Sequence, residues 1–556
     1  MIIFLAIFAG ILNSMVFYDM KGEIKNSRNL IKMEVKVELD KENEFFDFKL
    51  NKDLVIAEDS IFEFQKIQSK DVYNLWRVKR KDNKRFRSFV LKYEGKIDYP
   101  FIETEEYERA FRTTIGKITN EGCYLTGETY YYPKFDNLIK GFRFEITTDG
   151  YQTILPGIRE KHIKTNDYVK DIWLSDAPLE DIALVCGRFY EYSKKTDKYT
   201  IYIFLRTDDR LLADRYIDYG IKYIDFYSKA IGDYPYKKFA VVENFWETGY
   251  AFPSFTLLGS TVIRFPFIFS TSYPHEILHN WFGNGIWVYY DKGNWSEGLT
   301  AYLSDHLISE MLGKGWEYRR ASLKRYISHL KDSINFPLSK FKERYSSLTQ
   351  SVGYDKSLMF FHTLRKEIGD ENFINAVKNL YRDYKFKKIS WDEIREVFEK
   401  TAKRRLFDFF KLYVYQTELP EIKIRNIIFS SHTILFESLS TLDLTQKLPI
   451  YFYFKDGDYK KEDIYISKDF KSFRFNFDKE VCALGVDPYF DVLRKINEKE
   501  MPPTFFDINT ADFFYIYPST YTEIFSSVYK TKKIKPLDTL VFSLDGNIYL
   551  IAVKPQ

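Results

Sequence analysis

The hydrophobic period of this chain changes twice, which limits the folds open to it. Between about residues 31 and 207, apolar and polar residues alternate in short runs such as MEVKVELD and FRFEITTD, as is typical of half-buried strands. From Leu211 to Ile231, and through most of residues 272–419, apolar residues recur at helical spacing. Alternating runs return after Pro420. We therefore predict a multidomain α+β protein with a mainly helical part between two mainly β parts.

The same pattern predicts domain boundaries. We expect an N-terminal β domain over residues 19–207, a helix-rich domain over 208–420 that also holds the extended stretches FAVVENFW and YAFPSFTLLG, and a C-terminal β domain over 421–507. A small appended α/β unit is expected over 508–556, with a hairpin turning at Asp545-Gly546-Asn547. A chain of 556 residues is long enough for this number of domains.

Composition excludes several classes of protein. The 83 basic residues nearly balance the 79 acidic ones, so the chain is not a strongly basic nucleic-acid-binding protein, and we expect no nucleic-acid partner. Cys123, Cys186 and Cys482 lie far apart in the sequence. Their spacing predicts neither a disulfide framework nor a cysteine-based metal site.

The N-terminus carries an unbroken apolar run from Ile2 to Leu12. Its length suits the core of an export signal and is too short to span a bilayer, but basic residues before it and a clear cleavage site after it are missing. We interpret residues 1–18 as a signal peptide or a short anchor, with a buried first strand as the alternative. Export or a cell-envelope location is favoured over the cytoplasm, and no later segment reaches transmembrane length.

One short segment carries most of the chemistry, the His-Glu-x-x-His motif at His275, Glu276 and His279. Residues i and i+4 share one face of a helix, so both imidazoles can reach the same metal ion. Glu276 follows the first histidine and is placed to act on a water molecule rather than to bind the metal. Seven histidines in 556 residues make a chance occurrence of the motif rare.

Catalytic zinc takes three protein ligands, so a third donor is needed. Glu297 opens the next helical stretch, with Ser296 as its expected cap, and is the predicted ligand. Asp291 is the competing ligand, but it lies in a loop. Asp305 could accept a hydrogen bond from a zinc-binding histidine without binding the metal itself, although an ordinary solvated aspartate is the simpler interpretation.

The segments HEILHNWFGN and WSEGLTAYL together resemble the membrane alanyl aminopeptidase family of zinc metallopeptidases, which includes leukotriene hydrolase-like enzymes. The spacer between them, Asn280 to Ser296, is one residue shorter than is usual there, and the KGNW-x-EGL pattern resembles a bacterial branch. Looser similarity covers most of residues 30–507. The resemblance implies a β saddle domain, a thermolysin-like zinc domain and a C-terminal β domain, in agreement with the order of periodicities.

The resemblance also implies roles for residues away from the zinc motif. Gly353-Tyr354-Asp355-Lys356 is similar to a Tyr-Glu-Lys-Gly box, with Ser357 at the position of its glycine, so Tyr354 would stabilise the oxyanion. Gly249, Tyr250, Ala251 and Phe252 correspond to a substrate-binding box. In the family that box, Gly-x-Met-Glu-Asn, carries a glutamate that binds the substrate's amine, and here Phe252 stands at the position of that glutamate. Glu128 is the alternative amine anchor, and Glu243 and Glu247 lie too far along an extended strand.

We conclude from the sequence that the chain is a metallopeptidase with one Zn²⁺ per chain, held by His275, His279 and Glu297. Glu276 would serve as general base and Tyr354 as oxyanion donor. The expected partner is a peptide or protein substrate, cleaved in an aminopeptidase-like way or, as the alternative, by an endopeptidase with relaxed N-terminal selectivity. An inactive zinc-binding scaffold is the hypothesis from a different class. The sequence does not determine the oligomeric state.

Overall fold

The computed structural model describes residues 15–103, 112–330, 335–496 and 500, and the backbone of residues 543–544 and 547–548. Contacts between Cα atoms divide the chain into two compact units. One comprises residues 1–287 with 381–388, and the other residues 288–380 with 389–556. Within the described ranges, no helix combines the length and apolar character needed to cross a membrane.

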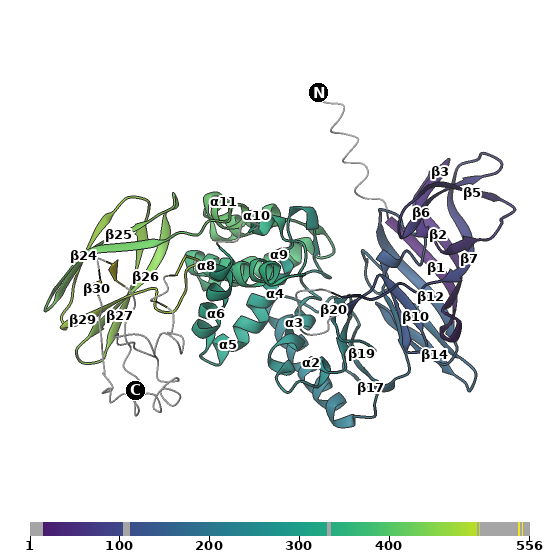
Figure 1. Ribbon diagram of the computed structural model, residues 1–556, viewed down its shortest axis with the longest axis horizontal. Helices are drawn as coiled ribbons and strands as arrows, with labels where there is room; N and C mark the ends of the chain where they lie inside the picture. The colour runs from purple at the N-terminus through teal and green to yellow at the C-terminus, as the bar shows by residue number, and fades with distance from the viewer. Residues whose placement is uncertain are drawn as a thin grey trace. The chain divides into compact units, whose positions relative to one another are not determined.

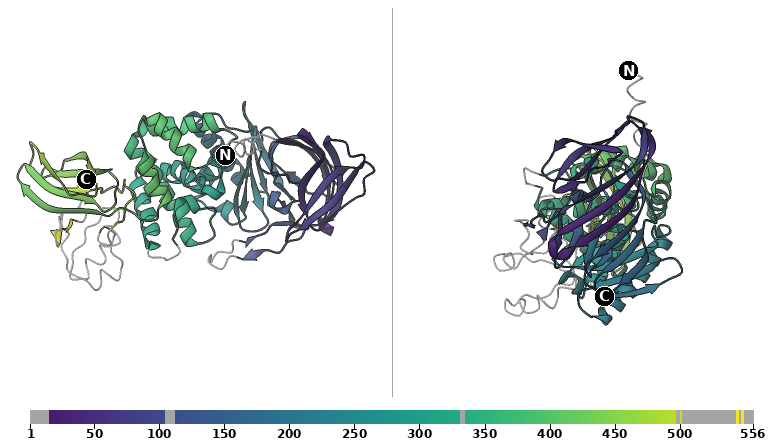
Figure 2. Two further views of the ribbon diagram at one scale, coloured as in Figure 1. Left: turned by 90° about the horizontal axis from the view of Figure 1, so that it is seen from above. Right: turned by 90° about the vertical axis from the view of Figure 1, so that its right-hand side faces the viewer.

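A seven-stranded sheet, in the order β14-β15-β12-β1-β2-β7-β4, forms much of the first unit (Figures 1 and 2). Strand β1 pairs in parallel with β12 and antiparallel with β2, so the start of the described chain lies inside the sheet. Its strands are β1 (Met15–Lys25), β2 (Leu30–Asn43), β4 (Leu54–Ile56), β7 (Phe86–Lys96), β12 (Leu138–Thr148), β14 (Ile158–Lys164) and β15 (Val169–Leu174). In β1 and β2, buried and more exposed residues alternate, as the sequence pattern predicts.

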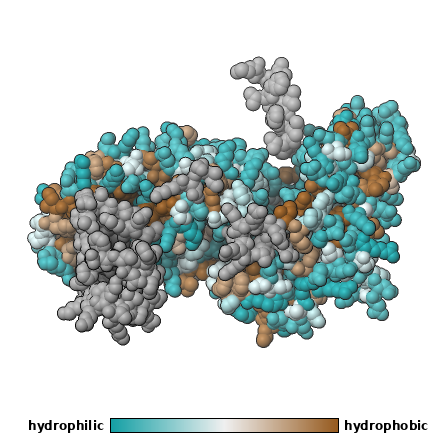
Figure 3. Space-filling view, in the orientation of Figure 1, coloured by the Kyte–Doolittle hydropathy of each residue, from teal (hydrophilic) through white to brown (hydrophobic). Residues whose placement is uncertain are grey.

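Smaller sheets complete the β part of this unit. One has the order β3-β6-β5, a second has the order β10-β11-β16-β13, and β8 pairs with β9. Their strands are β3 (Phe45–Asn51), β5 (Phe62–Ser69), β6 (Tyr73–Arg80), β8 (Ile102–Glu103), β9 (Arg112–Thr113), β10 (Gly116–Thr119), β11 (Gly122–Leu125), β13 (Gln152–Ile154) and β16 (Leu184–Gly187). Hydrophilic side chains cover most of the described surface in the view of Figure 3, as expected where one face of each strand is solvated.

A five-stranded sheet in the order β17-β18-β19-β21-β20 follows in the same unit. It consists of β17 (Tyr190–Lys195), β18 (Thr200–Leu205), β19 (Lys238–Asn244), β20 (Gly249–Phe252) and β21 (Phe255–Gly259). The first helix after it is α3 (Ser272–Leu278), and α2 (Arg210–Ala230) packs against both β18 and α3. Every residue of β19 and β21 is buried, whereas β20 lies at the edge of the sheet and is more exposed.

The second unit combines a group of helices with a C-terminal β part (Figures 1 and 2). The helical elements are α4 (Ser296–Ala301), the π-helix η6 (Tyr302–His306), α5 (Leu307–Met311), α6 (Gly315–Ser328), α7 (Ser347–Gln350), the π-helix η8 (Ser351–Lys356), α8 (Ser357–Ile368), α9 (Asp370–Tyr384), α10 (Trp391–Ala402) and α11 (Phe407–Tyr415). The short strands β22 (Trp287–Val288) and β23 (Lys388–Ile389) pair with each other.

Two three-stranded sheets enclose the C-terminal core. Their orders are β24-β25-β28 and β27-β26-β29. The strands are β24 (Ile422–Ser430), β25 (Thr433–Ser440), β26 (Gln446–Phe454), β27 (Tyr459–Ile466), β28 (Lys471–Asn476) and β29 (Val481–Val486). Ile434, Ile450, Phe452 and Leu484 belong to the core that these sheets bury.

Several sequence predictions need revision. Residues 15–18, grouped with the candidate signal or anchor, are the first residues of β1, and Val16 and Tyr18 are buried. The extended stretch YAFPSFTLLG is a hairpin of β20 and β21, because Ser254 adopts a positive φ of 66° between them. Residues 280–295 form turns, bends, the short strand β22 and a 3-10 turn rather than α-helix.

The two chain ends lie largely beyond the described residues. Residues 1–14 and most of the predicted unit 508–556 lie outside them. Strand β30 (Ser543–Leu544) pairs antiparallel with β31 (Asn547–Ile548), in agreement with the predicted hairpin.

Candidate metal centre and substrate strand

Helix α3 sets the geometry of the histidine pair. It is short, and its buried face is anchored by Tyr273, whose hydroxyl donates to the carbonyl of Tyr216 at 2.8 Å. The backbone N–H of His279 still donates to the carbonyl of His275 at 3.1 Å, so helical geometry extends over the whole motif. The two imidazoles therefore share one face, and their Nε2 atoms lie 3.1 Å apart.

The orientation of His279 follows from a backbone contact. Its Nδ1 lies 3.0 Å from the carbonyl oxygen of Phe282. Because a carbonyl can only accept, Nδ1 carries the proton and Nε2 is left with its lone pair for a metal. This outer partner is a main-chain atom, so the residue types gave no signal for it, and Asp305 is not needed in that role.

Glu297 lies in the first turn of α4. The N-cap position of α4 is Trp295, which makes no side-chain cap hydrogen bond. The side-chain oxygen of Asn294 accepts from the backbone N–H of Ser296 at 3.0 Å and from its hydroxyl at 2.7 Å, so the expected cap, Ser296, is instead the first residue inside the helix. One donor atom each from His275, His279 and Glu297 all lie within 4.8 Å of one another, and these three residues are the one such group found in the described part of the chain.

This donor set fits a zinc ion. Two imidazoles and one carboxylate are the ligands of one type of catalytic zinc site. Two zinc–nitrogen bonds of about 2.0–2.1 Å at a tetrahedral angle place their nitrogens roughly 3.3 Å apart, close to the 3.1 Å between the histidines. Glu276 is half-buried on α3 and does not belong to the group of donor atoms. Asp291, the competing ligand, has a 92% exposed side chain and pairs with Lys342 at 2.6 Å.

Tyr354 lies on η8, which packs against both α4 and α8. Its half-buried ring packs edge-on against Phe341. Both α4 and α7 continue into π-helical turns, a rare geometry that is frequent at functional sites. The α4–α8 contact is close, because a Cβ on Gly298 would come within 1.8 Å of Ser357 Oγ. Ser357, which the sequence resemblance matches to a glycine, is the residue that α4 meets.

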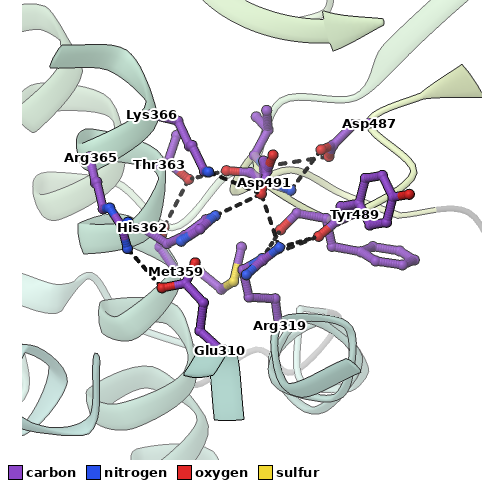
Figure 4. A network of polar contacts seen from close by, with 12 residues as sticks. Glu310, Arg319, Met359, His362, Thr363, Arg365, Lys366, Asp487, Tyr489 and Asp491 are labelled. Carbon is purple, nitrogen blue, oxygen red and sulfur yellow. Dashed lines mark hydrogen bonds and ion pairs between the residues drawn. The ribbon is translucent and has the colours of Figure 1, made fainter. Parts of the chain in front are cut away.

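A buried polar network connects these helices to the chain after β29 (Figure 4). Asp491 accepts from His362 Nε2 at 2.8 Å and pairs with Arg319 at 3.0 Å. His362 Nδ1 lies 3.1 Å from the hydroxyl of Tyr302, and His306 Nε2 lies 2.9 Å from Arg319. The π-helical turn that follows Glu297's helix is therefore held in a network of polar groups from α6, α8 and the C-terminal β part.

Charges in this network are set by burial and by neighbours. Burial lowers the pKa of His362 to about 3, and the Arg319 guanidinium adds to that effect against the favourable contact with Asp491. Burial likewise lowers the pKa of His306, and His362 and Arg319 contribute. Both histidines are therefore neutral near pH 7, and His362 donates through Nε2 to the Asp491 carboxylate.

Residues Gly249, Tyr250, Ala251 and Phe252 form the edge strand β20, which also lies against α3. Phe252 stacks on Phe255 with ring centroids 4.8 Å apart, and Tyr250 stacks on Tyr124 of β11 at 6.0 Å. The free edge of a strand presents backbone groups that an extended peptide can pair with. All four predicted substrate-binding residues thus lie beside the helix that carries the histidines.

Asn280 holds this strand to α3. Its side-chain oxygen accepts from the backbone N–H of Ser254 in the β20–β21 turn at 2.9 Å, and its nitrogen donates to the carbonyl of Ile277 at 2.9 Å. Asn280 is fully buried. Sequence reasoning treated this residue only as the start of the spacer.

The acidic side chains near β20 have different hydrogen-bond and ion-pair partners. Glu243 is buried and pairs with Arg264 at 2.7 Å, and it also accepts from the backbone N–H of Arg206. Glu247 accepts from the backbone N–H of Thr261 at 2.9 Å. Glu128 is exposed and lies near enough to Tyr124 to raise that residue's pKa, although burial is the main cause and Tyr250 the next.

Residues 271–413 match the Peptidase family M1 domain. Aminopeptidase 2, mitochondrial, of Saccharomyces cerevisiae is 22% identical over 344 residues, which is 54% of this chain and 36% of that protein. Aminopeptidase M1-C of Oryza sativa subsp. japonica is 21% identical over 280 residues, 46% of this chain and 32% of that protein. The chain thus matches about a third of the length of these curated relatives.

Among solved structures, a variant of an M1 zinc metallopeptidase from Deinococcus radiodurans with a bound Tyr-Ser-Ala substrate has a TM-score of 0.56 and 13% identity. The similarity covers 73% of this chain and 95% of that one. At this identity it is evidence about the fold. It confirms the predicted order of N-terminal β sheets, helical middle part and C-terminal β sheets.

Proposed function

We propose that this chain, whose residues 271–413 match the Peptidase family M1 domain, is a zinc-dependent metallopeptidase with aminopeptidase-like action. The observation that carries the proposal is the convergence of His275, His279 and Glu297 within 4.8 Å. Glu276 adjoins the first of them on the same helix. A metal-binding scaffold would need the three ligands but would have no use for this fourth group.

His275, His279 and Glu297 would hold the zinc, one ion per chain. A zinc ion supplies Lewis acidity, which lowers the pKa of a water molecule and polarises a carbonyl group. Phe282 contributes by fixing the tautomer of His279 through its carbonyl. Asn294 contributes by fixing the N-terminus of the helix that carries Glu297.

Glu276 would take a proton from the attacking water as its oxygen adds to the scissile carbonyl carbon. The same carboxyl group would then deliver that proton to the leaving amine. General acid–base help of this kind is worth about 100- to 10,000-fold in rate. Tyr354 would donate a hydrogen bond to the oxyanion that forms, a contact whose loss costs on the order of 100- to 1,000-fold.

Substrate would bind as an added strand beside β20. Backbone groups of residues 249–252 would hold its main chain, and the rings of Tyr250 and Phe252 would line the cleft. Phe252 cannot bind an amine, Glu243 is paired with Arg264, and Glu247 lies five positions before Phe252 along the chain, too far on an extended strand to replace it. Glu128 is the remaining acidic candidate on this side. We therefore propose that the enzyme prefers free N-termini by less than about a hundredfold, less than a buried amine–carboxylate contact could supply.

The test is digestion of a peptide library by the zinc-loaded protein, read by mass spectrometry. The library contains each peptide with a free and with an N-acetylated terminus, and a parallel sample contains a chelator. The proposal is supported if both the free and the N-acetylated peptides are cleaved, if the free peptides are cleaved from their N-termini, and if the chelator stops the cleavage. Absence of cleavage supports the scaffold. A preference above a hundredfold that is lost in Glu128→Gln identifies a strict aminopeptidase with Glu128 as its anchor.

A further inference from the structure

Cys123 and Cys186 face each other across two strands of the first unit. Strands β11 and β16 pair antiparallel, and their register places Cys123 directly opposite Cys186. Directly opposed residues in antiparallel strands point to the same face, with Cα atoms about 4.5 or 5.5 Å apart. Disulfides join Cα atoms that are about 4.4–6.8 Å apart. The backbone therefore has the spacing of a disulfide in either type of pair.

The surroundings of the two thiols are closed. Cys123 and Cys186 are 0% and 1% exposed. The side chain of the buried Asn26 donates to Cys186 Sγ at 3.4 Å and to the carbonyl of Thr119 at 2.8 Å. Burial raises the pKa of Cys123 well above its ordinary value, and the neighbouring thiol of Cys186, within hydrogen-bonding reach, adds to this. In the folded domain the thiol of Cys123 thus stays protonated and both sulfurs are shielded from solvent, which excludes a role as exposed nucleophiles.

We propose that Cys123 and Cys186 are a disulfide-forming pair that is oxidised while the N-terminal β domain folds in the presence of a small-molecule disulfide. One cysteine thiolate attacks the disulfide RSSR, forms a mixed disulfide and releases one RS⁻. The second thiolate attacks the sulfur of the first cysteine and releases the other RS⁻, so two thiols are oxidised and one RSSR is reduced to two RSH. Exchange takes place before β11 and β16 close over the sulfurs.

The bridge would join segments that are distant in the sequence. It closes a loop that contains β12, β13, β14 and β15. Three of these strands, β12, β14 and β15, belong to the seven-stranded sheet. Closing a loop of this length restricts the unfolded chain strongly. It also fixes β11, whose Tyr124 stacks on Tyr250 of the candidate substrate strand. The disulfide would therefore stabilise the domain that supports β20.

The chain provides its own reference thiol. Cys482 lies on β29 in the other unit, where its sulfur lies 3.4 Å from the carbonyl oxygen of Tyr453. Protein unfolded with reductant is refolded in a mixture of reduced and oxidised glutathione, then denatured and alkylated, and the thiols are counted by intact mass. We expect one alkylated cysteine after oxidative refolding and three after reduction. Unreduced digestion should yield a peptide that links Cys123 to Cys186.

Cys482→Ser is the matched control, for which we expect no alkylated cysteine after oxidation and two after reduction. Three free thiols in the oxidatively refolded wild type, or a linked peptide that contains Cys482, would overturn the proposal. Stability gives a second measurement without any substitution. The urea midpoint of the oxidised protein should exceed that of the same reduced protein by about 1 M or more, and equal midpoints would contradict a stabilising bridge.

Discussion

Gly298→Ala probes the contact that holds the helix of Glu297. The added Cβ would lie 1.8 Å from Ser357 Oγ and 2.2 Å from Ser357 Cβ, both far inside van der Waals contact. Both residues are buried, so α4 and α8 must separate to admit it. Overpacking of this kind costs about 1–3 kcal/mol, and the better helix propensity of alanine returns up to about 1 kcal/mol. We expect a net loss of about 1–2 kcal/mol in the free energy of unfolding.

The position of the clash allows a sharp control. Ser357→Gly removes both clashing atoms, and the nearest remaining atom is the Ser357 carbonyl carbon at 3.0 Å. Ser357→Ala removes the hydroxyl but keeps the Cβ at 2.2 Å. In the Gly298→Ala background, the glycine should therefore recover most of the lost stability and the alanine should not. Each double variant is compared with its own Ser357 single variant, because glycine at the start of a helix has its own cost.

The assay is urea unfolding of the metal-free proteins, followed by zinc affinity measured against a chelating indicator. Because Glu297 precedes Gly298, we expect zinc affinity to fall with the displacement of α4 and to recover in the same glycine variant. Stability and zinc affinity of Gly298→Ala equal to those of the wild type would refute the packing argument. Equal rescue by glycine and alanine would show that the hydroxyl rather than the Cβ is the obstacle.

Three further predictions concern single groups. Loss of a group that only hydrogen-bonds to a zinc ligand lowers metal affinity about 10- to 100-fold, so Glu297→Ala, which removes a ligand, should weaken zinc binding by more than that. Asp291→Ala, an exposed control, should bind zinc normally in the same titration. Tyr354→Phe should lower kcat by about 100- to 1,000-fold with little change in KM, and a change in KM alone would limit the tyrosine to substrate binding. For His362, the folded pKa of about 3 lies below the ordinary value of 6.5, so the unfolded chain binds the extra proton between these values. The free energy of unfolding of the metal-free protein should therefore fall as pH drops from 6.5 toward 5, by up to about 1.4 kcal/mol per pH unit from this group. Urea midpoints measured across this range should depend less on pH in His362→Gln, whereas the exposed control His432→Gln should keep the wild-type dependence.

Long periodic segments could be predicted from the sequence because their pattern repeats many times. The helix expected over Leu211 to Ile231 is Arg210–Ala230, and α10 (Trp391–Ala402) lies within the segment of helical spacing predicted over 272–419. The metal motif was predictable for a related reason. The spacing of His275 and His279 fixes their relative position through the helix itself, and a carboxylate in the first turn of the next helix is the nearest rigid donor.

Features that depend on a single backbone conformation or on distant partners gave no such signal. The turn at Ser254 uses a positive φ without a glycine, so the hairpin was hidden in one extended stretch. The N-cap of α4 is Trp295 rather than Ser296, and Asn294 hydrogen-bonds to the first helical residue, a difference that only the folded structure decides. His362 and Asp491 are 129 positions apart, and Cys123 meets Cys186 only through the register of β11 and β16. Pairings over such separations depend on the fold and leave no local pattern.

The central claim is that Glu276 performs chemistry at a zinc site built by its neighbours, and Glu276→Gln tests it most directly. The substitution keeps the size of the side chain and leaves the three donor residues intact, so zinc content per chain and peptide turnover are measured on the same purified sample. The account predicts about one zinc per chain with turnover lowered by at least about 100-fold. A variant that retains more than a tenth of wild-type turnover, or one that loses its zinc together with its activity, would contradict it.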